Sequence, residues 1–315
     1  YCQQLRGQDN VAFNKNNQKK RQDRGHFLYG ACFKCLVRLG VFIQVRQPMK
    51  KILPSEITSY DLFKTLAVVL MIADHVGYYF FPDDNLWRVF GRMCVPIWFF
   101  LVGYAQSRDL GLKMWVGAGI LVAANFITGM SIFPLNILAS MLAVRLVIDR
   151  AAKSVLMAEN VFWAIVLIMF FLIAPTMFVV EYGTQGLILS VFGFIIRRRD
   201  EFNIPKKLVE KYTIAAFLMF VLPQAVFFGF TQGQFMAMSA GVLIMMMTLF
   251  YFQPRTFPRL TKALPRPFVW LLHIGGRRTL EIYVAHLLLF KFMGAIIEPD
   301  RFVWFDWKWL TMTGT

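Results

Sequence analysis

The sequence predicts an all-α membrane protein, a polytopic bundle of transmembrane helices. Of its 315 residues, 57% are hydrophobic and 16% are aromatic, and only 17% are charged. Soluble domains contain about 45–50% apolar and about 25% charged residues. No single soluble core could bury so much apolar surface, and long apolar runs recur along the chain.

The formal net charge of +16 has two possible explanations. In a soluble protein it would suggest a nucleic-acid partner. In a membrane protein, basic loops on the cytoplasmic side account for it. The positions of the basic residues favour the second explanation, so we expect membrane lipids as the surroundings and no nucleic-acid partner.

Four cysteines, Cys2, Cys32, Cys35 and Cys94, do not make a disulfide framework. Cys32 and Cys35 form a lone CxxC with no second pair to complete a zinc site. We therefore predict no metal site.

Residues 1–48 differ in composition from the rest of the chain. The stretch "NKNNQKKRQDRG" is polar and basic, whereas "MKKILPSEITSYDLFK" from Met49 resembles a natural start. We interpret residues 1–48 as a basic, disordered extension or an over-called start, and residues 49–315 as the membrane domain. The alternative is a juxtamembrane polybasic tail that contacts anionic lipid.

A membrane-spanning helix requires roughly 17–25 mainly apolar residues. The apolar runs predict nine spans, at residues 60–81, 86–106, 112–129, 132–148, 160–180, 184–198, 211–230, 234–252 and 279–297. The segment "PRPFVWLLHIGG" (265–276) is too short to span and predicts an interfacial or re-entrant piece.

Basic residues gather in alternate loops, which predicts the orientation. One set of loops contains "FPDDNLWR", "GMSIFP", "EYGT" and "FTQGQ", with Arg88 as its sole basic residue. Cytoplasmic loops carry the excess of Lys and Arg, so the N-terminus is expected in the cytoplasm and the C-terminus outside. We expect a multi-pass protein of the bacterial inner membrane. The other set of loops holds Arg108, Lys113, Arg150, Lys153, Arg197, Arg198, Arg199, Lys206, Lys207, Arg255, Arg259, Lys262, Arg266, Arg277 and Arg278.

The first predicted span carries ionisable side chains on one stripe. An α-helix advances about 100° per residue, which places Asp61, Lys64, His75 and Tyr78 on one side, with Asp74 beside them. A charge near the bilayer centre costs at least ~2.5–3.5 kcal/mol. The stripe is therefore expected to face the bundle interior.

Two arginines of the second span complete the candidate site. Arg88 and Arg92 are four residues apart and share a helix face. Because the second span returns across the membrane, Arg92 is expected to meet His75 and Asp74 in the outer half of the bilayer. The alternative is a helix hairpin braced by an Asp–Arg pair, with His75 bonded to a carbonyl.

The segment "DLFKTLAVVLMIADHVGYYFFPDDNLWRVFGRMCVPIWFFLVGY" resembles the opening of the TraX family of membrane proteins. The family pattern is Asp-Leu-x-Lys, an apolar run, Asp-His-hydrophobic-Gly, Gly-Arg and Pro-hydrophobic-Phe. Later segments, "NILASML" from Asn136, "YGTQG" from Tyr182 and "LEIYVAHLLLF" around His286, are also similar, although Val284 and Ala285 depart from the family's usual Pro-Leu. The resemblance covers residues 60–297. The matching motif residues are Asp61, Lys64, Asp74, His75, Gly77, Gly91, Arg92 and Pro96.

This resemblance implies acyl transfer. The TraX family is associated with N-terminal acetylation of conjugative pilin. It is distantly similar to the membrane acyltransferase-3 group, which moves acyl groups from coenzyme A to extracytoplasmic sugars. That group has a Phe-Phe-x-x-Gly-Tyr-like stretch, which "FFLVGY" (99–104) of this chain matches. We expect acyl-CoA, such as acetyl-CoA, as donor substrate, no permanently bound cofactor, and an amine or hydroxyl of a protein or glycan as acceptor.

The candidate catalytic residues are His75, Asp74 and Arg92. A histidine, with an unperturbed pKa of about 6.5, is suited to accept the acceptor's proton. Asp74 or Asp61 could fix its tautomer as the third member of a triad does. Arg92 could bind a phosphate or stabilise an oxyanion.

Five further residues are candidates for binding substrate or coenzyme A: Lys64, Asp61, Arg88, Asn136 and His286. Lys64 lies near the cytoplasmic end of its helix, where a coenzyme A phosphate would arrive. Asn136 could instead make an interhelical hydrogen bond, and His286 could be structural. Glu181 is expected to be solvated.

A proton-coupled transporter is the alternative function, because intramembrane Asp, His and Arg side chains also serve as proton relays. Transporters commonly contain internal repeats. The latter half has no second copy of the Asp-His…Gly-Arg hairpin, and nine spans do not divide evenly. The sequence therefore favours the enzyme.

Overall fold

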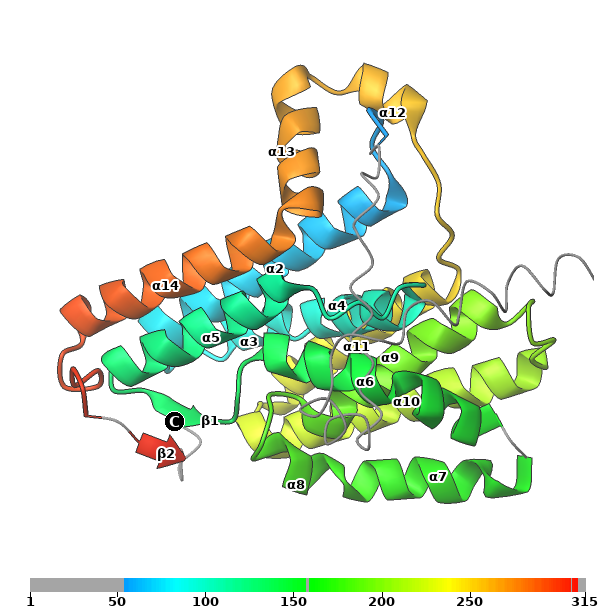
Figure 1. The fold of residues 1–315 in the computed structure, drawn as a ribbon, viewed down its shortest axis with the longest axis horizontal. Coiled ribbons are helices and arrows are strands. Elements are labelled where there is room, and N and C mark those ends of the chain that lie inside the picture. The colour runs from blue at the N-terminus through cyan, green and yellow to red at the C-terminus, as the bar shows by residue number, and fades with distance from the viewer. Residues whose placement is uncertain (1–53, 157–158, 307, 311–315) are drawn as a thin grey trace, which may run out of the picture. The chain divides into compact units, whose positions relative to one another are not determined.

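Helices make up most of the computed structural model, which describes residues 54–156, 159–306 and 308–310 (Figure 1). The predicted extension, residues 1–48, and its CxxC pair lie outside these residues. A two-stranded parallel sheet joins β1 (Ser131–Phe133) to β2 (Lys308–Leu310). The other described elements are helices.

A helix lies at each of the nine predicted spans. In chain order these are α2 (Ser59–Phe80), α3 (Leu86–Gly91) with α4 (Cys94–Tyr104), α5 (Leu112–Ile127), α6 (Ile137–Leu156), α7 (Glu159–Phe171) with α8 (Ile173–Met177), α9 (Gly183–Arg198), α10 (Lys206–Phe228), α11 (Gln232–Phe250) and α14 (Thr279–Ile297). Two more helices, α12 (Pro258–Ala263) and α13 (Arg266–Arg277), lie between α11 and α14.

Among the described residues, five helical stretches are long and apolar enough to cross a membrane: α2, α3 with α4, α10, α11 and α14. Helix α5 and residues 161–171 of α7 are apolar but shorter. The predicted class, an all-α membrane protein, is confirmed. The count of nine spans and the N-in, C-out orientation remain predictions.

Helix α2 begins with a capping box. Thr58 accepts a hydrogen bond from the Asp61 backbone N–H, and the Asp61 carboxylate accepts one from the Thr58 backbone N–H. Both bonds satisfy amide groups that a helix start leaves unpaired. The helix ends at Phe80, just before Pro82, which cannot continue it.

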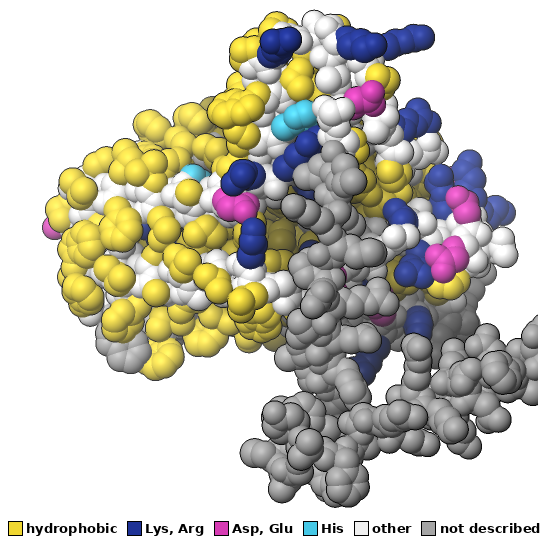
Figure 2. Space-filling view, turned by 45° about the horizontal axis from the view of Figure 1, so that its top comes forward, with side chains coloured by type: hydrophobic (Ala, Val, Ile, Leu, Met, Phe, Trp, Pro, Cys, Tyr) yellow, Lys and Arg dark blue, Asp and Glu magenta, His cyan; other side chains and the backbone are white. Residues whose placement is uncertain are grey.

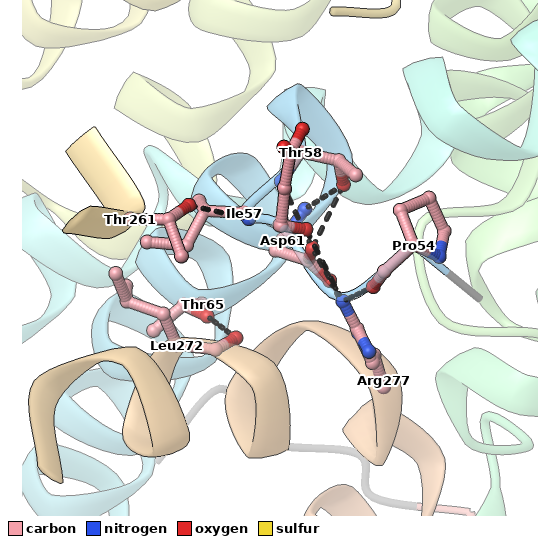
Figure 3. Close-up of polar contacts among 9 residues, drawn as sticks. Pro54, Ile57, Thr58, Asp61, Thr65, Thr261, Leu272 and Arg277 are labelled. Atoms are coloured by element: carbon pink, nitrogen blue, oxygen red, sulfur yellow. Dashed lines mark hydrogen bonds and ion pairs between the residues drawn. The ribbon is translucent and has the colours of Figure 1, made fainter. Parts of the chain in front are cut away.

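Helix α13 is fastened to the beginning of α2 (Figure 3). The Arg277 guanidinium lies 3.3 Å from a carboxylate oxygen of Asp61 and donates a 2.7 Å hydrogen bond to the Pro54 carbonyl. The Thr65 hydroxyl donates to the Leu272 carbonyl at 3.0 Å. The first turns of α2 therefore pack against α13 and its later turns against α14, which runs alongside it (Figure 1).

The segment predicted to be interfacial or re-entrant forms α13. This helix buries Gly275 and Gly276 against α2 and exposes Phe268, Trp270 and Leu271. An amphipathic helix of this kind is suited to a membrane surface. Its location there remains a prediction.

Glycines set the closest helix contacts in the bundle. A Cβ atom at Gly103 of α4 would overlap the Ser190 carbonyl of α9, and one at Gly193 would overlap the Phe100 carbonyl. Because neither glycine carries a side chain, the α4 and α9 backbones approach closely, and the Ser190 hydroxyl bonds the Phe99 carbonyl at 2.9 Å.

Two glycines of the opening motif serve the α2–α3 hairpin in the same way. A Cβ atom at Gly77 would overlap the Trp87 side chain, and one at Gly91 would overlap the Asp74 carboxylate. These glycines bring α3 close enough for its arginines to reach α2.

The surface separates hydrophobic from basic side chains. On the face shown in Figure 2, hydrophobic groups cover a broad area, whereas Lys and Arg gather elsewhere. Large side chains such as Leu112, Val226 and Ile296 are more than three-quarters exposed. Extended apolar surface of this kind indicates contact with lipid.

Candidate functional site

The carboxylate of Asp74 binds two arginines of the returning helix. Its Oδ2 atom lies 2.5 Å from Arg92 Nη2 and 3.2 Å from Arg88 Nη1. The Asp74 and Arg92 side chains are only 8% and 7% exposed. In a low-dielectric interior such a group of charges is held strongly, and the two arginines leave it with a net positive charge.

Aromatic rings enclose both guanidinium groups. Arg92 lies 4.8 Å from the Phe228 ring centroid, and Arg88 lies 4.8 Å from that of Tyr78. Arg92 Nη1 also donates a 2.9 Å hydrogen bond to the Tyr182 hydroxyl. Tyr182 has a φ of 63°, a left-handed conformation that costs about 1–3 kcal/mol and is often found at functional sites.

His75 contacts a second histidine. Its Nδ1 lies 2.9 Å from Nε2 of His286, whose Nδ1 lies 2.7 Å from the Ile282 carbonyl oxygen. A carbonyl only accepts, so His286 Nδ1 carries the proton and Nε2 of the neutral ring is an acceptor. His75 then donates from Nδ1. Its Nε2 is left unprotonated and has no hydrogen-bond partner within the described part of the chain.

His75 and Asp74 therefore face different neighbours. Consecutive residues of a helix point about 100° apart. Asp74 turns to α3 and His75 turns to α14, and no carboxylate of the described residues is hydrogen-bonded to the imidazole. His286 takes the position that the sequence assigned to Asp74 or Asp61. It lies level with His75, because the two ring nitrogens are 2.9 Å apart.

Three of the predicted binding residues have structural contacts or lie apart from His75. Both carboxylate oxygens of Asp61 are used by the α2 cap and by Arg277. Asn136 donates a 3.1 Å hydrogen bond to the Ala118 carbonyl of α5, as in the structural role that the sequence left open for it. Lys64 lies eleven residues before His75 on α2, and its electrostatic neighbours are Asp61 and Arg145. Arg88 and His286 do lie at the site.

Sequence reasoning missed Lys291 and placed Glu181 in solvent, although the two charged residues are electrostatic neighbours. Lys291 of α14 is 5% exposed and donates to Asn125 Oδ1 at 2.5 Å. Glu181 was expected to be solvated but is partly buried in the loop between α8 and α9, where Lys291 and Arg92 are its electrostatic neighbours. Burial raises the pKa of Glu181 to about 7. A lone lysine inside the apolar run "LLLFKFM" was the available signal.

The sequence model of the TraX family, described as TraX protein, matches residues 59–264, more than half of the chain. The chain belongs to the TraX family.

An uncharacterized protein of Rickettsia prowazekii (strain Madrid E) is 29% identical to this TraX protein over 139 residues. The match covers 44% of this chain and 56% of the relative, so the chain spans little more than half the length of the curated protein it matches. No solved structure is significantly similar to the chain.

The opening TraX motif divides into structural and site residues in this protein. Asp61 caps α2, and Gly77 and Gly91 allow close helix packing. Asp74 and His75 lie at the centre of the polar cluster. The motif therefore contains both the residues that shape the α2–α3 hairpin and the polar side chains of the candidate site.

Within the described residues, no group of three His, Cys, Asp or Glu side chains is placed to hold a metal ion. The described cysteine, Cys94, is buried in α4. What the cluster offers is an unprotonated imidazole nitrogen with Arg88 and Arg92 among its electrostatic neighbours.

Proposed function

We propose that this TraX protein is an integral membrane acyltransferase that moves an acetyl or other acyl group from acyl-CoA to an amine or hydroxyl of a protein or glycan. The observation that carries the proposal is the His75–His286 pair. It leaves one nitrogen of His75 unprotonated, and the charges of Arg88, Arg92 and Asp74 act on this ring. A base next to a net positive charge is the arrangement that acyl transfer requires.

In the proposed reaction, His75 Nε2 accepts the proton of the acceptor N–H or O–H as that atom attacks the thioester carbonyl carbon. The resulting imidazolium keeps its Nδ1–H bond to His286. When the tetrahedral intermediate collapses, the C–S bond breaks and Nε2 returns the proton to the leaving thiolate. The products are the acylated acceptor and coenzyme A, with atoms and charge balanced.

The arginines would act through their positive charge. The tetrahedral intermediate carries an oxyanion, which a fixed cation in a low-dielectric site stabilises without reorganisation. Arg92 is held by Asp74 and Tyr182, so its position is set before substrate arrives. His286 is a positioning residue because it acts through the His75 ring.

Membership of the TraX family supports acyl transfer as the reaction, since the family is associated with pilin acetylation. The acceptor of this chain is left at the level of an amine or hydroxyl. We also propose the bacterial inner membrane as its location, which agrees with the basic loops and with a bacterial relative.

The test is transfer of label from acetyl-CoA. Vesicles containing the full chain are incubated with acetyl-CoA labelled in the acetyl group, and label is counted in the protein and glycan fractions. His286→Ala is expected to reduce transfer, and His273→Ala, a histidine of α13 outside the cluster, is the matched control. Proton-driven solute uptake with no transfer of label would contradict the proposal and favour a transporter.

A further inference from the structure

Three basic side chains from different helices form no close ion pair with a carboxylate among the described residues: Lys64 of α2, Arg145 of α6 and Arg197 of α9. Each is partly buried. None was included in the site around His75, and Arg145 was not singled out from the sequence. They lie at the end of the bundle where α4 finishes.

The contacts place these cations around the last turn of α4. The Arg197 guanidinium lies 5.0 Å from the Tyr104 ring centroid. Arg108 donates to the Ala105 carbonyl at 2.6 Å and caps α4. Arg145 Nη1 donates to the backbone carbonyl of Asp109 at 2.5 Å.

Lys64 and Tyr60 connect α2 to this cluster. Lys64 and Arg145 are close enough to repel one another, and Arg108 repels Arg145 as well. Tyr60, one turn before Lys64, interacts with Arg197. The cluster thus joins α2, α6 and α9 at one end of α4.

The nearby acids also have other partners. Asp61 attracts Lys64 and Asp109 attracts Arg145. Asp61 is shared with Arg277, however, Asp149 pairs with Arg108, and the Asp109 carboxylate is also bonded by the Ser107 hydroxyl. Positive charge is therefore in excess. Like charges held together in a partly desolvated place are unfavourable without a counter-ion.

An unfilled hydrogen-bond donor is a second, independent sign. Arg145 Nε is buried and has no partner among the described residues, while Nη1 is held by a backbone carbonyl. A buried N–H without an acceptor costs free energy that a ligand oxygen would recover. Guanidinium groups match phosphate oxygens particularly well.

We propose that Lys64, Arg145 and Arg197 form a binding site for the phosphate groups of the acyl donor. The identity of the donor rests on the proposed function. The eleven residues from Lys64 to His75 correspond to about 16 Å along a helix at about 1.5 Å per residue. Coenzyme A has a long pantetheine arm between its phosphates and its thioester, so one molecule can reach from this cluster to His75.

The experiment measures binding of adenosine 3′,5′-bisphosphate, the phosphate-bearing end of coenzyme A, to the purified full chain by titration calorimetry. Lys64→Gln and Arg145→Gln are each expected to weaken binding about tenfold or more, because each removes a charge-assisted hydrogen bond. Arg150→Gln changes an exposed arginine of the same helix and is the matched control. Arg145→Lys keeps the charge and is expected to retain part of the affinity, which separates loss of binding from loss of folding.

A second arm distinguishes this site from the catalytic proposal and from lipid. His75→Ala is expected to bind the bisphosphate like wild type, even though its acyl transfer is lost. Unchanged bisphosphate affinity in folded Lys64→Gln and Arg145→Gln proteins would overturn the site. The site would also be overturned if the two variants lost binding only to phosphatidylglycerol, presented in phosphatidylcholine vesicles, and kept their affinity for the bisphosphate. That result would assign the cluster to a lipid headgroup.

Discussion

At the scale of single residues, the adjacent Asp74 and His75 have separate tasks. Asp74 holds Arg88 of α3 and Arg92, which follows that helix, and His75 pairs with His286 of α14. Helical periodicity led to the expectation that Arg92 meets Asp74 and His75, and the structure shows contact between Arg92 and Asp74. It could not predict that the carboxylate turns away from the imidazole, because that depends on which helices pack on each side of α2.

Asp74→Asn is expected to destabilise the protein by about 3–5 kcal/mol, because it leaves the buried Arg92 and the partly buried Arg88 without their counter-ion. His75→Ala, which removes a neutral ring, is expected to unfold close to the wild-type temperature. Thermal unfolding in detergent compares the two variants. Equal unfolding temperatures for Asp74→Asn and wild type would contradict a buried charge group.

Glu181 predicts a pH-dependent contribution to stability. Burial raises its pKa from 4.5 to about 7, against the attraction of Lys291 and Arg92. Between these pH values the folded protein keeps a proton that the unfolded chain has lost, so the free energy of unfolding falls as the pH rises from 4.5 to 7. Glu181→Gln removes this loss.

The expected result is a higher unfolding temperature for Glu181→Gln than for wild type at pH 8, with the difference shrinking toward pH 4. Glu210→Gln, in an exposed pair with Lys206, is the control and should change little at either pH. A Glu181→Gln protein less stable than wild type at pH 8 would show that the carboxylate is ionised and needed.

At the scale of helices, apolar runs predicted the location of each span but not the breaks within two of them. The second span is divided at residues 92–93 and the fifth at residue 172. In each case a proline, Pro96 or Pro175, follows the break. A proline lacks an N–H and clashes with the carbonyl four residues earlier, which is residue 92 or 171. Pro223, in contrast, lies inside an unbroken α10, so proline alone does not decide.

Helix packing gives a prediction for Gly103. Gly103→Ala places a methyl group on the Ser190 carbonyl oxygen, and backbone cannot move aside as a side chain can. We expect poor insertion or a strongly lowered unfolding temperature. Gly119→Ala in α5, where a Cβ atom would meet no atom within 4 Å, is the matched control and should be tolerated. A normally folded Gly103→Ala protein would contradict the close α4–α9 contact.

At the scale of the whole molecule, the sequence predicted the all-α membrane class because apolar content and the recurrence of apolar runs are properties of composition and order. It did not predict the His75–His286 contact, since residues 211 positions apart meet through tertiary packing. Lys291 was missed for the same reason. The surroundings of Lys291 are formed by Asn125 and Glu181, which lie in distant parts of the sequence.

The topology is tested by reporter fusions. With nine spans and a cytoplasmic N-terminus, fusions after Arg199 and Arg259 should report the cytoplasm, and a fusion after Gly233 should report the outside. A cytoplasmic signal after Gly233 would reverse the orientation. The cluster of Lys64 and Arg145 would then lie on the side that acyl-CoA does not reach.

The most direct test of the central claim compares acyl transfer by wild type and His75→Ala. Both full-length proteins are purified, their folding is matched by thermal unfolding, and release of the coenzyme A thiol from acetyl-CoA is measured with acceptor present. Removal of a general base predicts a loss of about 10²–10⁴-fold in rate for a protein that remains folded. A folded His75→Ala protein that turns over acetyl-CoA at the wild-type rate would contradict the assignment of His75 as the base.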